Sequence, residues 1–138
     1  MKATKITVET TVKAPVEKVW KLYTSPEHIV KWNSASDDWH TTKAENDVQT
    51  GGKFLSRMEA KDGSFGFNFE GVYDNIRVNE RIAYTMSDGR KAEITFTGEK
   101  NETKMTVVFD AENENPIEMQ REGWQAILDS FKKYTETN

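Results

Sequence analysis

Residues 51–110 read GGKFLSRMEAKDGSFGFNFEGVYDNIRVNERIAYTMSDGRKAEITFTGEKNETKMTVVFD and carry the strongest structural signal in the chain. Apolar and polar residues alternate along this stretch, and short turn sequences such as Asp62-Gly63 and Asp88-Gly89 interrupt the alternation. Connections of two to five residues join antiparallel neighbours, because a parallel crossover needs about a dozen residues. The pattern therefore predicts antiparallel strands at 53–60, 65–76, 81–86, 91–97 and 103–110.

Outside this stretch, two further strands and three helices are expected. Residues 5–12 alternate clearly, and residues 39–44 do so weakly. The three prolines all stand where helical patterns begin: Ala14-Pro15, Ser25-Pro26 with Ser25 as N-cap, and Asn115-Pro116 with Asn115 as N-cap and proline at the first helical position. The last helix is about 20 residues long, so it alone can cover a sheet. Seven strands, two short helices after the first strand and one long terminal helix make an α+β fold.

Length and composition exclude several classes of protein. The chain has 138 residues, no cysteine and a formal net charge of −4. One domain over residues 1–138 is expected, and disulfide scaffolds and zinc ribbons are excluded. The mild acidity argues against nucleic acid as the main partner. No run approaches about 18 apolar residues, so no membrane span is expected. The N-terminus lacks an apolar signal core, so a cytoplasmic location is expected.

The alternation of residues along the strands separates an apolar face of the sheet from a charged one. The apolar face, taken as the inner one, holds Phe54, Ser56, Met58, Phe65, Phe67, Phe69, Gly71, Tyr73, Ile82, Tyr84, Met86, Ala92, Ile94, Phe96, Met105, Val107 and Phe109. The outer face holds Glu9, Arg57, Glu59, Glu70, Glu93 and Asp110. A bulge would reverse this phase locally, and Gly71 is the expected place for one.

This inner face offers hydroxyls but no acid, which favours a binding protein over an enzyme that uses acid–base chemistry. His40 joins the inner face only if the weak strand is phased with His40, Thr42 and Ala44 inward, and the residues leave that phase open. His28 and His40 have no third ligand in register, so neither a metal site nor any cofactor is expected.

Several short motifs, in their order and spacing, resemble the SRPBCC (START-like, helix-grip) superfamily. They are Ala14-Pro15, Val19-Trp20, Trp32, Gly51-Gly52-Lys53-Phe54, Phe69-Glu70-Gly71-Val72-Tyr73 and Gly123-Trp124. The most similar branch is the one named after the activator of the heat shock protein 90 ATPase, and the resemblance covers residues 5–134. It implies a curved seven-stranded antiparallel sheet that grips the terminal helix around an apolar cavity. In this superfamily such cavities bind lipids, sterols, polyketides or other hydrophobic molecules, and a minority of members are enzymes.

Residues and resemblance together predict a soluble intracellular binder of a small hydrophobic ligand, held between the sheet and the terminal helix. The expected ligand contacts are Trp32, Trp39, His40, Phe54, Met58, Phe67, Phe69, Tyr73, Tyr84, Met86, Phe96, Gln120, Trp124 and Leu128. Trp32 and Trp39 either close the pocket entrance or pack beneath it. Two alternatives stay open: a chaperone-interacting module, as the branch name suggests, and a cyclase- or hydrolase-like enzyme that uses His40 or a tyrosine.

Two details also stay open at this stage. A buried phenol needs a hydrogen-bond partner, so the hydroxyls of Tyr73 and Tyr84 either bond to backbone or water or orient a ligand. Gly123 lies inside a helix, where glycine costs about 1 kcal/mol relative to alanine. It either leaves room at the cavity mouth beside Trp124 or permits close helix–sheet packing.

Overall fold

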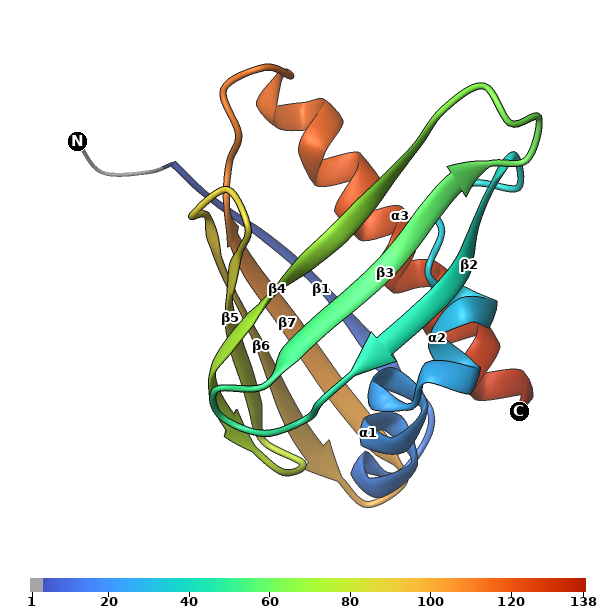
Figure 1. Cartoon of the computed structure of the whole chain (residues 1–138). Helices are drawn as coiled ribbons and strands as arrows, with labels where there is room; N and C mark the ends of the chain where they lie inside the picture. The colour runs from blue at the N-terminus through green and yellow to red at the C-terminus, as the bar shows by residue number, and fades with distance from the viewer. Residues whose placement is uncertain (1–3) are drawn as a thin grey trace.

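A computed structural model describes residues 4–138 and shows the expected α+β arrangement of a curled sheet around a long helix (Figure 1). Residues 1–3, which begin the N-terminal stretch discussed above, lie outside the described part. The elements are β1 (Lys5–Val12), α1 (Val16–Thr24), α2 (Pro26–Trp32), β2 (Trp39–Asn46), β3 (Lys53–Ala60), β4 (Gly66–Arg77), β5 (Arg81–Met86), β6 (Lys91–Glu99), β7 (Glu102–Asp110) and α3 (Ile117–Thr137).

The sheet has seven strands in the order β1-β7-β6-β5-β4-β3-β2, and every neighbouring pair is antiparallel. Short connections alone predicted the neighbours from β2 to β7. The sequence left the place of β1 open, because no hairpin joins it to another strand, and the structure places it beside β7. Helices α1 and α2 connect the two edge strands and cover one end of the curled sheet, while α3 crosses its concave side (Figure 1). The predicted fold class is confirmed.

The helix starts differ slightly from the prediction. Pro116 is itself the N-cap residue of α3, and Asn115 lies one position before it, where its side-chain amide donates to the Glu112 carboxylate. Ser25 does occupy the N-cap position of α2, with Pro26 at the first helical position, but its hydroxyl makes no capping hydrogen bond. The N-cap position predicted for Ser25 is therefore confirmed, while the prediction of Asn115 as the N-cap residue was wrong.

The bulge expected at Gly71 lies elsewhere. Gly71 pairs regularly with Phe54 on β3 and with Met86 on β5, and the register shifts only between Tyr73 and Asn75. A Cβ at Gly71 would lie 2.4 Å from the Thr85 carbonyl oxygen and 2.9 Å from the Phe54 ring. Glycine is required there because the Phe54 ring lies directly on the backbone, so a close approach explains this residue.

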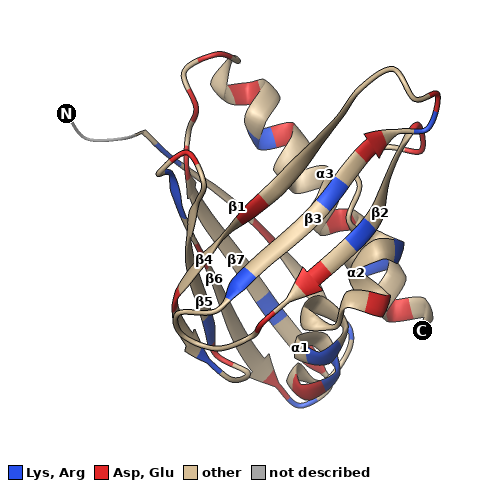
Figure 2. Ribbon diagram, in the orientation of Figure 1, with Lys and Arg blue, Asp and Glu red and all other residues tan. Residues whose placement is uncertain are grey.

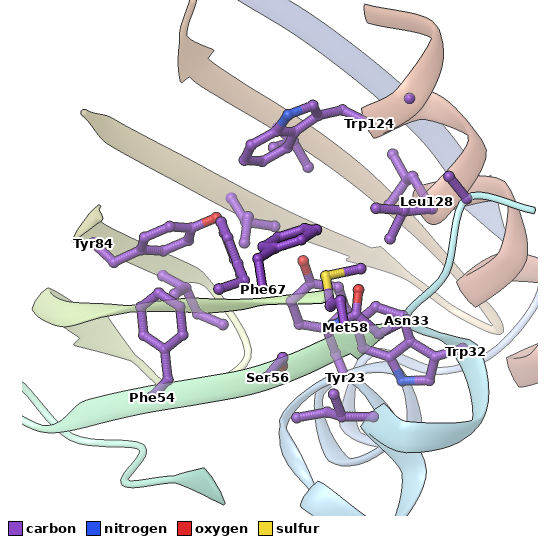
Figure 3. Close-up of a pocket in the computed structure, with 18 of the residues that line it drawn as sticks. Tyr23, Trp32, Asn33, Phe54, Ser56, Met58, Phe67, Tyr84, Trp124 and Leu128 are labelled. Atoms are coloured by element: carbon purple, nitrogen blue, oxygen red, sulfur yellow. The ribbon is translucent and has the colours of Figure 1, made fainter. Parts of the chain in front are cut away.

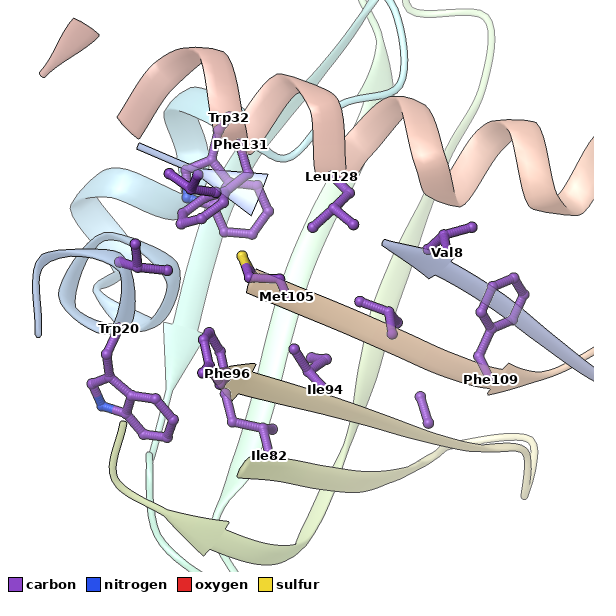
Figure 4. Packing of buried hydrophobic residues seen from close by; sticks show 14 of the residues in the cluster. Val8, Trp20, Trp32, Ile82, Ile94, Phe96, Met105, Phe109, Leu128 and Phe131 are labelled. Carbon is purple, nitrogen blue, oxygen red and sulfur yellow. The ribbon is translucent and has the colours of Figure 1, made fainter. Parts of the chain in front are cut away.

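One half of the interior is packed solid. Val8 on β1, Met105 and Phe109 on β7, and Leu128 and Phe131 on α3 are all buried in one cluster (Figure 4). This cluster fixes the C-terminal half of α3 against the β1–β7 side of the sheet. Such a core anchors the helix firmly, and it leaves the other side of the sheet free to stand away from α3.

The outer face of the sheet carries paired charges, as the strand phase predicted. Arg81 Nη2 lies 2.9 Å from Glu93 Oε2, and Arg57 Nε lies 2.9 Å from Glu59 Oε2. Figure 2 shows Lys and Arg interspersed with Asp and Glu over the strands and helices. Within residues 4–138, no helix combines the length and apolarity that crossing a membrane requires.

Candidate ligand cavity

A cavity of about 510 Å³ lies between α3 and the β2–β5 side of the sheet, opposite the packed core. Its wall is mostly apolar and aromatic, with side chains from α1, α2, α3 and strands β2 to β7 (Figure 3). The volume falls within the range of about 300–1,000 Å³ that is typical of small-molecule sites. The interior is therefore hollow on the side of the sheet that carries most of the predicted contacts.

Phe54 organises the sheet side of the cavity. Its ring centroid lies 4.8 Å from that of Tyr84, 5.1 Å from that of Tyr73 and 5.6 Å from that of Phe69. These rings come from β3, β4 and β5, so the antiparallel register brings them together on the concave face. Mutual ring contacts of this kind hold each ring in place and give the wall a defined shape.

On the helix side, Trp124 and Gly123 shape the cavity. The indole of Trp124 stacks on Phe109 with a centroid distance of 3.8 Å and an interplanar angle of 9°. This contact ties the cavity wall to the packed core. A Cβ built at Gly123 would meet no atom within 4 Å. Gly123 therefore leaves open space beside Trp124, and close helix–sheet packing does not explain it.

The end of the cavity near α1 and α2 is closed by stacked aromatic rings. Tyr23 and Trp32 stack with a centroid distance of 4.9 Å, and Phe131 lies edge-on to both at 5.0 Å. Trp32 Nε1 donates to the Leu22 carbonyl oxygen at 2.9 Å. Trp32 thus lines the closed end from beneath and does not form the entrance.

The mouth combines exposed apolar rings with a few charges. Trp39 and Phe67 lie there with a centroid distance of 6.0 Å, and Phe65, which precedes the first residue of β4, is 62% exposed. Phe65 was expected on the inner face with Phe67, and its ring centroid lies 6.2 Å from that of Phe67, but it does not line the cavity. Glu45 and Glu112 also line the cavity, together with Arg90, whose Nε already lies 2.7 Å from Asp88 Oδ2.

The tyrosine hydroxyls divide into two kinds. Tyr73 donates to Asn46 Oδ1, and the Asn46 amide in turn donates to the Thr24 carbonyl oxygen at 2.7 Å. The hydroxyls of Tyr84 and Tyr23 have no hydrogen-bond partner within residues 4–138, and both residues line the cavity. Burial raises the pKa of Tyr84, with a smaller contribution from the phenol of Tyr23. Burial likewise raises the pKa of Tyr23 and of Tyr73, so all three phenols stay protonated at neutral pH.

Eleven of the fourteen predicted contacts line the cavity. They are Trp32, Trp39, Phe54, Met58, Phe67, Phe69, Tyr73, Tyr84, Gln120, Trp124 and Leu128. Their role as ligand contacts remains a prediction. Gln120 is already engaged, since its amide bonds to Glu112 N at 2.9 Å and to Asn115 O at 2.7 Å. The Gln120 side chain therefore holds the loop before α3 in place through these hydrogen bonds.

The other three predicted contacts lie away from the cavity. His40 pairs with Glu59, an outer-face residue, because a register shift between Thr41 and Lys43 turns Thr41 and Ala44 inward. Phe96 packs edge-on against Trp20 at 5.2 Å, inside the solid core. Met86 is buried near the β5–β6 hairpin. The inward phase considered for His40 was therefore wrong.

Sequence reasoning missed several residues of the cavity wall, notably Tyr23, Asn33, Ser36, Asn46 and Arg90. In the sequence, Tyr23 stands at helical spacing from Val16, Val19 and Trp20, which indicates one apolar face of α1. Nothing in that spacing shows that a hydroxyl at the tip of an apolar face reaches a cavity. The loop between α2 and β2 gave no periodic signal at all, so the positions of Asn33 and Ser36 could not be inferred.

An antiparallel sheet curled around a C-terminal helix, with an apolar cavity between them, defines the helix-grip class of α+β domains. A family model named Activator of Hsp90 ATPase homolog 1-like protein matches residues 13–136. The chain belongs to this family, as the sequence resemblance predicted. No functionally curated protein matches the chain.

Solved structures agree with this assignment. An AHSA1-like protein from Aeromonas hydrophila is 40% identical with a TM-score of 0.91, over 97% of this chain and 93% of that one. A protein from Cytophaga hutchinsonii is 54% identical with a TM-score of 0.83, over 97% and 93%. A protein from Chromobacterium violaceum shares the fold at 23% identity, with a TM-score of 0.87 over 98% and 99%.

Proposed function

We propose that this protein binds a small hydrophobic molecule in the cavity between α3 and the β2–β5 side of the sheet. The observation that carries the proposal is the contrast between the two halves of the interior. One half is packed around Phe109 and Phe131, while the other holds an open-mouthed cavity of about 510 Å³ with a wall of aromatic rings. A domain of this size gains stability by filling its core, so an unfilled apolar space indicates a use for that space.

The wall supports binding in a second way. Its rings are held by one another and by Trp124, which stacks on the core, so the cavity is preformed. A preformed site loses little conformational entropy when it takes up a ligand, and its affinity is correspondingly higher. Apolar lining then supplies most of the binding free energy, at about 25 cal/mol for each Å² of apolar surface removed from water.

The test uses the tryptophans of the wall as reporters. Trp32, Trp39 and Trp124 line the cavity, so a bound molecule should change their fluorescence. Fatty acids, sterols and aromatic polyketides are titrated against the protein, and freshly purified protein is examined by native mass spectrometry. We expect saturable quenching by at least one apolar class, with one molecule bound per chain.

The variant that tests the location of the site is Gly123→Leu, which places a side chain in the open space beside Trp124. We expect this variant to lose the saturable change while keeping its folded circular dichroism spectrum. If no apolar class binds, or if the variant binds as tightly as the unaltered protein, the cavity is not the binding site.

A second candidate is a chaperone partner, which the family name raises and one surface feature favours. Phe65 at the β3–β4 hairpin is 62% exposed, and its ring contacts Trp39 with a centroid distance of 6.0 Å. Exposed aromatic residues of this kind are enriched in protein interfaces. An ATPase assay with an Hsp90 chaperone tests the idea, with Phe65→Ser as the variant. A rate that does not change on addition of the unaltered protein removes this candidate.

A further inference from the structure

Three hydroxyls face the cavity without a partner. They belong to Tyr23 on α1, Ser56 on β3 and Tyr84 on β5, and none of them makes a hydrogen bond within residues 4–138. Ser56 is 7% exposed and Tyr84 is 6% exposed. Ser56 lies between the other two in the view of Figure 3, where the Tyr84 oxygen points into the cavity.

The three hydroxyl oxygens are open to the cavity, since Thr135 Oγ1 is the fully buried side-chain oxygen that lacks a partner within residues 4–138. The apolar wall around them offers few other acceptors, and most hydroxyls inside folded proteins have a hydrogen-bond partner. Tyr73, in the same wall, has one in Asn46. The three free hydroxyls therefore provide donors for an oxygen of a ligand, and the phenol of Tyr23 lies near enough to that of Tyr84 to raise its pKa.

The charges of the cavity indicate what kind of oxygen this is. Arg90 is the cationic side chain that lines the cavity within residues 4–138, and Asp88 already neutralises it at 2.7 Å. Two carboxylates, Glu45 and Glu112, also line the wall. A carboxylate ligand would lose its hydration without gaining a free cation, and it would meet two like charges. A neutral oxygen avoids both costs.

We propose that the cavity takes an uncharged apolar molecule with one accepting oxygen, such as a ketone, which two of the hydroxyls of Tyr23, Ser56 and Tyr84 hold, and that it discriminates against carboxylates such as fatty acids. This inference rests on the proposed function and adds the ligand's charge and polar group. The raised pKa values of Tyr23 and Tyr84 agree with it, because protonated phenols remain hydrogen-bond donors at neutral pH.

The experiment uses three probes of one shape: methyl naphthyl ketone, the naphthoate anion and ethylnaphthalene. Their affinities are measured at neutral pH by tryptophan fluorescence and checked by NMR titration. We expect the ketone to bind at least about tenfold more tightly than naphthoate, because a buried unpaired charge is far more costly than a buried neutral oxygen.

The variants Tyr84→Phe, Tyr23→Phe and Ser56→Ala remove one hydroxyl each. We expect each to weaken ketone binding about three- to tenfold where that hydroxyl is a donor, since a hydrogen bond contributes about 0.5–1.5 kcal/mol. Ethylnaphthalene should bind these variants as tightly as it binds the unaltered protein. Tyr134→Phe is the matched control, because the Tyr134 hydroxyl bonds to His28 Nδ1 at 2.7 Å outside the cavity wall.

The outcomes separate this inference from the proposed function. Naphthoate binding as tight as ketone binding, with a loss in Arg90→Gln, would show an anion site and overturn the inference while hydrophobic binding stands. Equal ketone affinity in all three hydroxyl variants would also overturn it. If none of the three probes binds, the proposed function fails and the inference fails with it.

Discussion

Gly123→Leu places four carbon atoms where a Cβ would meet no atom within 4 Å. In a packed interior, such a small-to-large change costs about 1–3 kcal/mol because neighbours must move. At Gly123 the Cβ displaces nothing, and the cavity beside it gives the rest of the side chain space. The substitution then also removes the helix penalty of glycine, which is about 1 kcal/mol relative to alanine, while leucine is nearly as good a helix former as alanine.

We therefore expect Gly123→Leu to raise the free energy of unfolding by about 1 kcal/mol, with a further gain from the apolar surface that the leucine buries. For a domain of this length, 1 kcal/mol corresponds to an increase in Tm of about 3–5 °C. The same side chain should obstruct the cavity mouth and weaken ligand binding at least about tenfold. Stability and binding should thus change in opposite directions.

The assay is urea unfolding followed by far-ultraviolet circular dichroism, with Gly71→Ala as the contrasting glycine. A Cβ at Gly71 would lie 2.4 Å from a backbone oxygen, so that variant should lose about 1–3 kcal/mol. A loss of stability in Gly123→Leu similar to the loss in Gly71→Ala would refute the reasoning, because it would mean that the space beside Gly123 is filled in solution.

Three further predictions concern hydrogen bonds and charge. Tyr73→Phe should lower the free energy of unfolding by about 1–2 kcal/mol, since it leaves the Asn46 oxygen without its donor; an unchanged urea midpoint would argue against that bond. Burial raises the pKa of Tyr84 above its ordinary value, so the contribution of Tyr84 to stability should be constant below about pH 10 and should fall above it, where the unfolded chain releases a proton that the native state retains. Phenolate absorbance that develops near pH 10 in the still-folded Tyr134→Phe variant, which keeps only the three tyrosines of the cavity wall, would contradict this. Burial alone would raise the pKa of Asp110, but hydrogen bonds led by that from Lys5 outweigh it and lower this pKa. Asp110→Asn should therefore be less stable at pH 7, by about 1 kcal/mol, and the deficit should shrink as the pH falls below about 4; a deficit that is constant with pH would contradict the assignment.

The fold was largely predictable because each strand carries its own signal. Alternation and Asp-Gly turns located the strands from β3 to β7, and short connections determined their order. The edge strand β2 was less certain, and its phase could not be predicted, because the register shift near Thr41 has no glycine or proline to mark it. The sequence marked Gly71 as the expected place of a bulge. Glycine is instead required there because the Phe54 ring, from another strand, lies against its backbone.

The cavity was predictable only in outline. The strand phase put the correct aromatic residues on the concave face, but periodicity does not show whether facing residues touch or leave a space. Phe96 and Phe54 both lie on the predicted inner face of the sheet. Phe96 is nevertheless part of the packed core, whereas Phe54 lies in the cavity wall. That difference depends on how α1 and α3 lie over the sheet, which arises from packing between distant segments. For the same reason, the sequence could not decide whether Gly123 leaves room beside Trp124 or permits close packing of the helix on the sheet.

Intermolecular NOEs test the hollow interior most directly. Protein with labelled methyl groups is mixed with ethylnaphthalene, and NOEs are recorded between the probe and individual methyls. We expect contacts to Met58 and Leu128, which line the cavity, and none to Ile6 and Val12, which are fully buried in the packed half. Contacts confined to surface methyls such as that of Val78, or no contacts at all, would show that the space between α3 and the sheet does not admit an apolar molecule.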